Sequence, residues 1–223
     1  MSTFEVPPER LAAWLDRWAA EHGGGVRTET LPGRVTFTGA DGASVVCEPP
    51  FPPLGGQNGV LETFAPAALL AHAARERVVG VLLVRLGGYA AGVFSGRRLV
   101  TSKVGTRPVH GRNRAGGQSQ SRFERKREGQ ARVAHDAAAD VAAQVLLAHA
   151  DDLDAVVLGG DRFALAAVLE DPRLRRLARI TSDRVLDVPD PRLAVLRSTP
   201  GRFRAAVLHT LDPRPAPPES PRL

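Results

Sequence analysis

The chain has 223 residues, of which 43% are hydrophobic and 5% aromatic, so it is long enough to bury one or two ordinary cores. Its formal net charge of +6 is modest. Cys47 is the only cysteine, which excludes an internal disulfide and a cluster of thiolate ligands for structural zinc. We therefore expect a protein of a reducing, cytoplasmic compartment that uses no metal and no cofactor.

Residues 1–72 predict a small α+β region. A helix is expected from Pro8, because large apolar residues recur on one face and glycines end the pattern at 23–25. Strand-like runs follow at 25–31, 34–39 and 43–49, then a proline-rich and glycine-rich loop at 49–59 and a helical run at 64–76. The first residues lack the pattern of a signal peptide, and no apolar run is long enough to cross a bilayer.

Three runs rich in valine and leucine follow at 77–86, 89–94 and 97–105. Glycine turns separate them, which predicts an antiparallel meander. Residues 106–117 have no periodicity, and such long loops in compact domains are usually functional or disordered. From Ser119 to about Ala150 an apolar stripe predicts one long helix. Its first turns are charged nearly all round, so we expect this end to project beyond the core.

The last third of the chain predicts a central strand at 153–160, helical segments at 161–169 and 171–178, and strands at 184–189 and 202–211. Asp171 is expected to cap the second helical segment. The pattern therefore predicts an α+β fold with a mixed β-sheet flanked by helices, in a domain over residues 73–212. Residues 213–223 form a proline-rich tail without a core-forming pattern.

Positive charge is concentrated in one part of the sequence. Between Arg97 and Arg132 there are eleven lysines or arginines against two glutamates. Such a cluster indicates a polyanionic partner that meets one face of the molecule, although a solvated charged helix would give the same count.

The triplet Gly-Gly-Gln occurs twice. The copy that ends at Gln57 lies among prolines, with no lysine or arginine between Glu48 and Ala74, and we interpret it as an ordinary loop. The copy that ends at Gln118 closes the long loop and leads directly into the arginine-rich helix. A glutamine amide does not titrate and cannot be a general base, but its backbone N–H can stabilise developing negative charge and its side chain can orient water.

The stretch GRNRAGGQSQSRFERKREGQ resembles the catalytic stretch of eukaryotic and archaeal class-I peptide-chain release factors. Their pattern is GGQS, two variable residues, then RFxRxR, and eight positions match it: Gly116, Gly117, Gln118, Ser119, Arg122, Phe123, Arg125 and Arg127. A looser similarity covers about residues 77–211. The first 70 residues are too few for a codon-reading domain, so the chain is most similar to the short actinobacterial release-factor-like peptidyl-tRNA hydrolases of ribosome-associated quality control.

This resemblance implies a release-factor middle-domain fold and codon-independent hydrolysis of the peptidyl-tRNA ester on stalled ribosomes or large subunits. The catalytic residues would be Gln118, Gly117 and Gly116, and the RNA-binding residues Arg112, Arg114, Ser119, Arg122, Arg125, Lys126 and Arg127. The partners would be peptidyl-tRNA and the 23S rRNA of the large ribosomal subunit at the peptidyl transferase centre, and we expect a monomer. Two alternatives remain open: cleavage of the tRNA near its 3′ end, and a non-catalytic module that binds ribosomal RNA.

Overall fold

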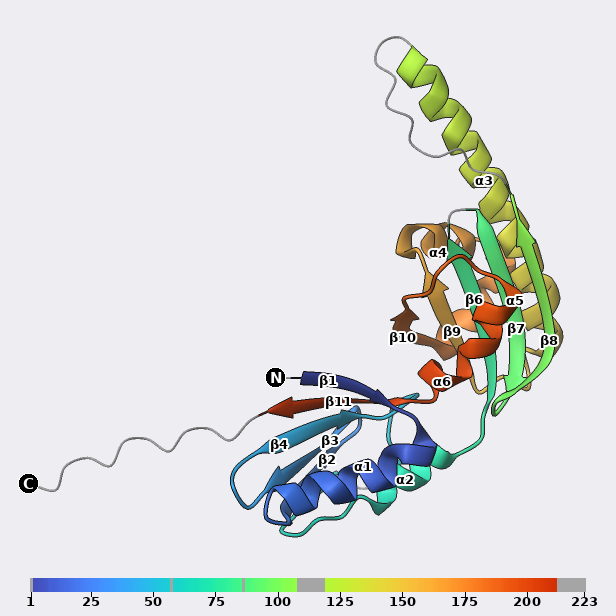
Figure 1. Cartoon of the computed structure of the whole chain (residues 1–223). Coiled ribbons are helices and arrows are strands. Elements are labelled where there is room, and N and C mark those ends of the chain that lie inside the picture. The colour runs from blue at the N-terminus through green and yellow to red at the C-terminus, as the bar shows by residue number, and fades with distance from the viewer. Residues whose placement is uncertain (1, 57, 86, 108–118, 212–223) are drawn as a thin grey trace, which may run out of the picture. The chain divides into compact units, whose positions relative to one another are not determined.

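The computed structural model describes residues 2–56, 58–85, 87–107 and 119–211, with the backbone alone for residues 119–127. The chain forms two compact units, shown in Figure 1. The first comprises residues 1–75 and 204–223, and the second comprises residues 76–203. None of the helices in the described ranges is long and apolar enough to cross a membrane.

The first unit is an antiparallel sheet packed against two helices, α1 (Pro8–Glu21) and α2 (Ala67–Ala74). Its strands follow the order β1-β11-β4-β3-β2-β5. Their bounds are β1 (Ser2–Val6), β2 (Gly25–Leu31), β3 (Arg34–Gly39), β4 (Ser44–Glu48), β5 (Gly59–Leu61) and β11 (Ala206–Leu211). Buried positions alternate along β3 and β4, as expected when one face of a sheet carries the core. That core joins Leu11, Leu15 and Trp18 of α1 to Phe37 and Cys47.

Strand β11 departs from the predicted division of the chain. The sequence pattern assigns residues 202–211 to the domain over 73–212, but β11 pairs antiparallel with β1 and β4 in the first unit. Ala206 and Leu208 are fully buried in the core of that unit. The local pattern identifies a strand correctly, but it carries no information on partners that lie about 160 to 200 residues away in the sequence.

The second unit contains a five-stranded mixed sheet with the order β10-β9-β6-β7-β8. Its strands are β6 (Val78–Arg85), β7 (Gly88–Ser95), β8 (Arg98–Thr106), β9 (Ala155–Gly160) and β10 (Thr181–Leu186). The β6-β7 and β7-β8 pairs are antiparallel, whereas β6-β9 and β9-β10 are parallel. The predicted mixed α+β fold and the predicted meander are therefore confirmed.

Helices lie on both faces of this sheet. They are α3 (Ser119–Leu146), η1 (Leu147–His149), α4 (Arg162–Leu169), η2 (Pro172–Ile180), α5 (Leu193–Ser198) and α6 (Pro200–Phe203). Tyr89 and Ala91 of β7 belong to the core formed with α3, whereas Gly92 leaves room for Leu196 of α5 and Phe94 contacts the ring of Phe203. Because side chains alternate along a strand, α3 and α5 cover opposite faces of β7.

Candidate active site

The predicted site residues fall into two groups. Arg112, Arg114, Gly116, Gly117 and Gln118 lie outside the described residues. The others, Ser119, Arg122, Arg125, Lys126 and Arg127, lie in the first turns of α3, for which the backbone is described. The predicted start of the long helix at Ser119 is confirmed. The α-helix ends at Leu146, and the short 3₁₀ helix η1 then covers the residues up to His149, close to the predicted end near Ala150.

The first half of α3 projects beyond the sheet, as expected from its charge pattern. In the described side chains of this helix, Ala134 is the first that is fully buried, and Glu128, Arg132 and Val133 are exposed. Fifteen residues separate Ser119 from Ala134, which at 1.5 Å per residue is about 22 Å of helix. Figure 1 shows these turns beyond the ends of β6 and β7. We call residues 119–133 the finger.

The last described residues before the finger, Thr106 and Arg107, are fixed to the same end of the sheet. Thr106 of β8 pairs with Gly88 of β7, and the N–H of Arg107 donates to the carbonyl of Gly87 at 2.8 Å. The register aligns Gly160 with Val84 and Tyr89 with Gly105 in one row across β9, β6, β7 and β8. We call this end of the sheet, where β6, β8 and β9 finish, the finger end.

The second half of α3 is anchored by apolar packing. Ala138, Ala142, Val145 and Leu146 are buried against the sheet, and small side chains let the helix lie close to β7. At the outer side of the helix, Lys103 Nζ donates to Gln144 Oε1 at 2.7 Å and joins α3 to β8.

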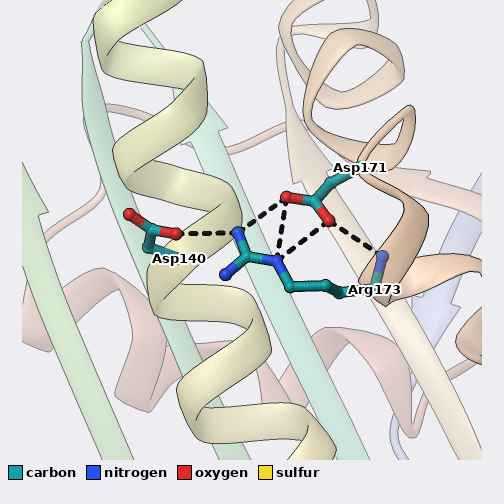
Figure 2. A network of polar contacts seen from close by, with 3 residues as sticks. All are labelled: Asp140, Asp171 and Arg173. Carbon is teal, nitrogen blue, oxygen red and sulfur yellow. Dashed lines mark hydrogen bonds and ion pairs between the residues drawn. The ribbon is translucent and has the colours of Figure 1, made fainter.

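An arginine joins α3 to η2, as Figure 2 shows. Arg173 Nη2 lies 2.7 Å from Asp140 Oδ1 on α3 and 2.7 Å from Asp171 Oδ2. Asp171 also accepts the backbone N–H of Arg173 at 2.9 Å, which confirms its predicted role as a cap. The Arg173 side chain, followed by its backbone N–H, holds the pKa of the Asp171 carboxyl below its usual value. Because Arg173 and Asp140 are at least half exposed, we expect this network to orient α3 and to contribute a small part of the stability.

The basic cluster seen in the sequence is divided by the fold. Arg97 and Arg98 lie at the β7-β8 turn, at the opposite end of β8 from Thr106. Nine residues of strand span about 26 Å at about 3.3 Å per residue step. Arg97 and Arg98 therefore lie well away from the finger end, and the single face expected for the eleven charges stays a prediction.

The described residues offer few other chemical groups. They contain no set of three His, Cys, Asp or Glu side chains that could hold a metal ion. Burial raises the pKa of the Cys47 thiol, which disfavours the nucleophilic thiolate. Sequence reasoning missed one close pair in the first unit, His22 Nδ1 and Asp41 Oδ2 at 2.8 Å, where His22 and then the N–H of Ala43 lower the pKa of Asp41. This pair joins the end of α1 to the β3-β4 turn.

A mixed sheet with a long helix that begins one residue after a Gly-Gly-Gln triplet is what we expect of a release-factor-like protein. The family model for the Actinobacteria/chloroflexi VLRF1 release factor matches residues 77–209. This is more than half of the chain, and the protein belongs to that family. The resemblance inferred from the sequence is thereby confirmed. A search of curated proteins found no match.

Among solved structures, the archaeal translation termination factor aRF1 is similar at 14% identity and a TM-score of 0.36, over 89% of this chain and 73% of that one. Dom34 of S. cerevisiae, a translation termination-like factor, is similar at 8% identity and a TM-score of 0.35, over 88% of this chain and 62% of that one. Pelota of Archaeoglobus fulgidus gives 13% identity and a TM-score of 0.27, over 83% and 57%. Because these identities and TM-scores are low, the family assignment rests on the family model alone.

Proposed function

We propose that this protein acts on ribosomes in translation termination or rescue and hydrolyses the ester of peptidyl-tRNA without reading a codon. One observation carries the proposal. In a chain of the release factor family, the triplet Gly-Gly-Gln directly precedes a helix that starts at Ser119 and projects beyond the sheet. A projecting helix is suited to carrying the residues at its start away from the body and into a confined site such as the peptidyl transferase centre.

In the proposed complex, the basic residues of the loop and finger contact ribosomal RNA. Arg112 and Arg114 precede the triplet, and the group Ser119, Arg122, Arg125, Lys126 and Arg127 follows it. Positions 122, 125 and 126 are three and four residues apart and are therefore neighbours on the helix surface. Each phosphate that such a cluster neutralises releases counterions, so binding should weaken steeply with salt.

The proposed reaction is the addition of water to the ester carbonyl that joins the peptide to the 3′-terminal ribose of the tRNA. The carbonyl oxygen becomes negatively charged as the water oxygen bonds to carbon, and the backbone N–H of Gln118 donates to it. The bond to the ribose oxygen then breaks, and that oxygen takes up a proton. Gly116 and Gly117 let the chain approach the substrate without a Cβ, and the Gln118 side chain positions the water. The ribosome supplies the remainder of the site.

The test compares release by the wild type and two glutamine variants. Large subunits that carry peptidyl-tRNA are incubated with wild type, Gln118→Ala or Gln57→Ala, and the tRNA-linked peptide is followed with time. Gln118→Ala keeps the backbone N–H and removes the side-chain amide that positions the water, and we expect it to slow release by about 100-fold, the lower end of the cost of removing a preorganised hydrogen-bonding group. Gln57→Ala is the matched control, because the same triplet there has no basic neighbours, and it should release peptide at the wild-type rate.

The length of the released tRNA separates this reaction from its alternatives. Ester hydrolysis leaves the terminal CCA intact, whereas cleavage near the 3′ end shortens the tRNA. Salt-sensitive binding without any release would indicate a non-catalytic RNA-binding module. Undiminished release by Gln118→Ala would exclude the proposed role of the glutamine side chain.

A further inference from the structure

Phe163 is the most exposed large hydrophobic residue in the described part of the chain. Its exposed fraction is 89%, whereas the next such residues, Leu61 and Val133, reach 54%. The ring therefore contributes almost nothing to the core of its own unit. Two hydrogen bonds of Asp161 hold the start of α4, the helix that carries Phe163, in place. Its carboxylate accepts the N–H of Ala164 at 2.8 Å, and its N–H donates to the Val84 carbonyl at 2.8 Å.

The start of α4, which carries Phe163, lies at the finger end of the sheet. Gly160, three residues earlier, is in register with Val84 at the end of β6. Side chains on a helix tilt toward its N-terminus, so Phe163, the second residue of α4, leans back over this end.

A small hollow is lined by residues of both α4 and α3, where the finger joins the rest of α3. Its volume is about 100 Å³, and its lining includes Ala164 of α4, Ala131 and Ala134 of α3, and Gly87. Gly87 accepts the N–H of Arg107, the last described residue before the stretch with the triplet. Ala164, the residue after Phe163, therefore shares a hollow with the finger and with Gly87, which binds the last described residue before the triplet.

Each of the three segments contributes an exposed arginine: Arg162 from α4, Arg132 from α3 and Arg107 after β8. Glu128 and Asp136 are the exposed acidic residues one turn away from Arg132 on α3, and the carboxylate of Asp161 is engaged by Ala164. Proteins bind unpaired RNA on surfaces that combine an exposed aromatic ring with exposed arginines, since the ring stacks on a base and the guanidinium groups contact phosphates.

We propose that Phe163 stacks on an unpaired base of large-subunit ribosomal RNA when the finger is inserted, with Arg162, Arg132 and Arg107 at the flanking phosphates. This inference rests on the proposed function, because insertion of the finger brings the finger end of the sheet toward the RNA that surrounds the peptidyl transferase centre. Phe163 thereby adds a second contact, outside the loop and the finger, that fixes how deeply α3 enters.

The first experiment measures binding without turnover. Full-length Gln118→Ala protein is titrated against vacant large subunits, alone and with a second substitution at position 163. Phe163→Ala should raise Kd by about fivefold to about 100-fold, the range seen on removal of a base-aromatic stack, and Phe163→Trp should stay within about twofold. Leu193→Ala, which removes another exposed apolar side chain from the same unit, is the matched control and should leave Kd unchanged.

Phe163→Leu distinguishes stacking from general apolar contact. It should behave like Phe163→Ala if the ring stacks, and restored binding by leucine would overturn the proposal, as would an unchanged Kd for Phe163→Ala. A photoreactive phenylalanine at position 163 gives an independent readout: crosslinks to ribosomal RNA support the stack, and crosslinks to ribosomal protein alone overturn it. Both measurements remain informative if the chain proves not to hydrolyse peptidyl-tRNA, because neither requires turnover.

Discussion

At the scale of single residues, the turn between β9 and α4 depends on one glycine. Gly160 has a φ of +107°, and a Cβ placed there would lie 2.1 Å from the carbonyl oxygen of Val84. The neighbouring residue Asp161 donates its N–H to that same carbonyl. Any side chain at position 160 must therefore displace the end of β6 or the start of α4, and with it the surface beside the finger.

We expect Gly160→Ala to destabilise the second unit by about 2 kcal/mol or more, because a strained backbone is combined with a steric overlap. This corresponds to a fall in Tm of about 4–8 °C. Gly129→Ala is the control, since Gly129 is helical and a Cβ there meets no atom within 4 Å. It should leave Tm unchanged or slightly raised. Equal effects of the two substitutions in thermal unfolding would contradict this account of Gly160.

At the scale of elements, the sequence predicted the strands and helices whose own residues form a clear apolar pattern. Strands β6 to β9 and helix α3 carry long apolar patterns, and the structure confirms them. Strand β1 was missed because only Val6 of its five residues is buried, and β5 because all three of its residues are exposed. Residues 171–178 were predicted to be helical, but η2 is a 3₁₀ helix, and β10 begins at Thr181, earlier than predicted.

The candidate site was predictable only in part. Its motif is contiguous in sequence, so Gln118 and the arginines around it could be named without a structure, and their roles stay predictions. The support of the finger is not contiguous: Asp140 and Arg173 are 33 residues apart, and the start of α4 is brought to the finger end by the pairing of Gly160 with Val84. No pattern of spacing reveals such contacts, because they depend on how α3, α4 and η2 pack together.

The link between α3 and η2 predicts a dependence of stability on pH. The pKa of Asp171 is lower in the folded protein than its ordinary value of 3.8, through hydrogen bonds from Arg173. The stabilisation is therefore fully present above pH 3.8 and is lost as the pH falls through the lower folded pKa. Asp171→Asn keeps a capping oxygen but loses the charge, so it should be less stable than wild type at pH 7, and this difference should close below pH 3.8.

Urea unfolding of wild type and Asp171→Asn at pH 7, 4 and 3 measures this difference. Asp183→Asn, at an exposed aspartate outside the network, is the control and should show no such convergence. A gap between wild type and Asp171→Asn that stays constant across the three pH values would contradict the assignment.

At the scale of the whole molecule, the chain leaves the first unit after Arg75 and returns to it at Arg204. Strand β11 lies between β1 and β4 in the sheet, and Arg204 Nη1 bonds Glu9 Oε1 of α1 at 2.7 Å. Without β11, the sheet of the first unit would be divided between β1 and β4. Every strand of the second unit, in contrast, lies within residues 76–203.

Deletion of residues 204–223 should therefore unfold the first unit and leave the second folded. Amide hydrogen exchange should show loss of protection in β1, β3 and β4 together with retained protection in β6, β7 and β9, because buried strands are the most protected elements. Deletion of residues 213–223 alone removes no residue of the sheet and is the control. Loss of protection in both units after the longer deletion would show that the second unit does not fold independently.

The pairing of β1 with β11 also sets an order of events during synthesis. Ser2 and Thr210 are neighbours in the sheet but are separated by 208 positions in the chain. At about 5 to 20 residues per second, a ribosome needs about 10 to 40 s to make the intervening polypeptide. The earliest strand must wait unpaired for that time, while the second unit, which is complete at Phe203, can fold first. We therefore expect the sheet of the first unit to be completed last, because synthesis has to reach the last strand before the first one has its partner.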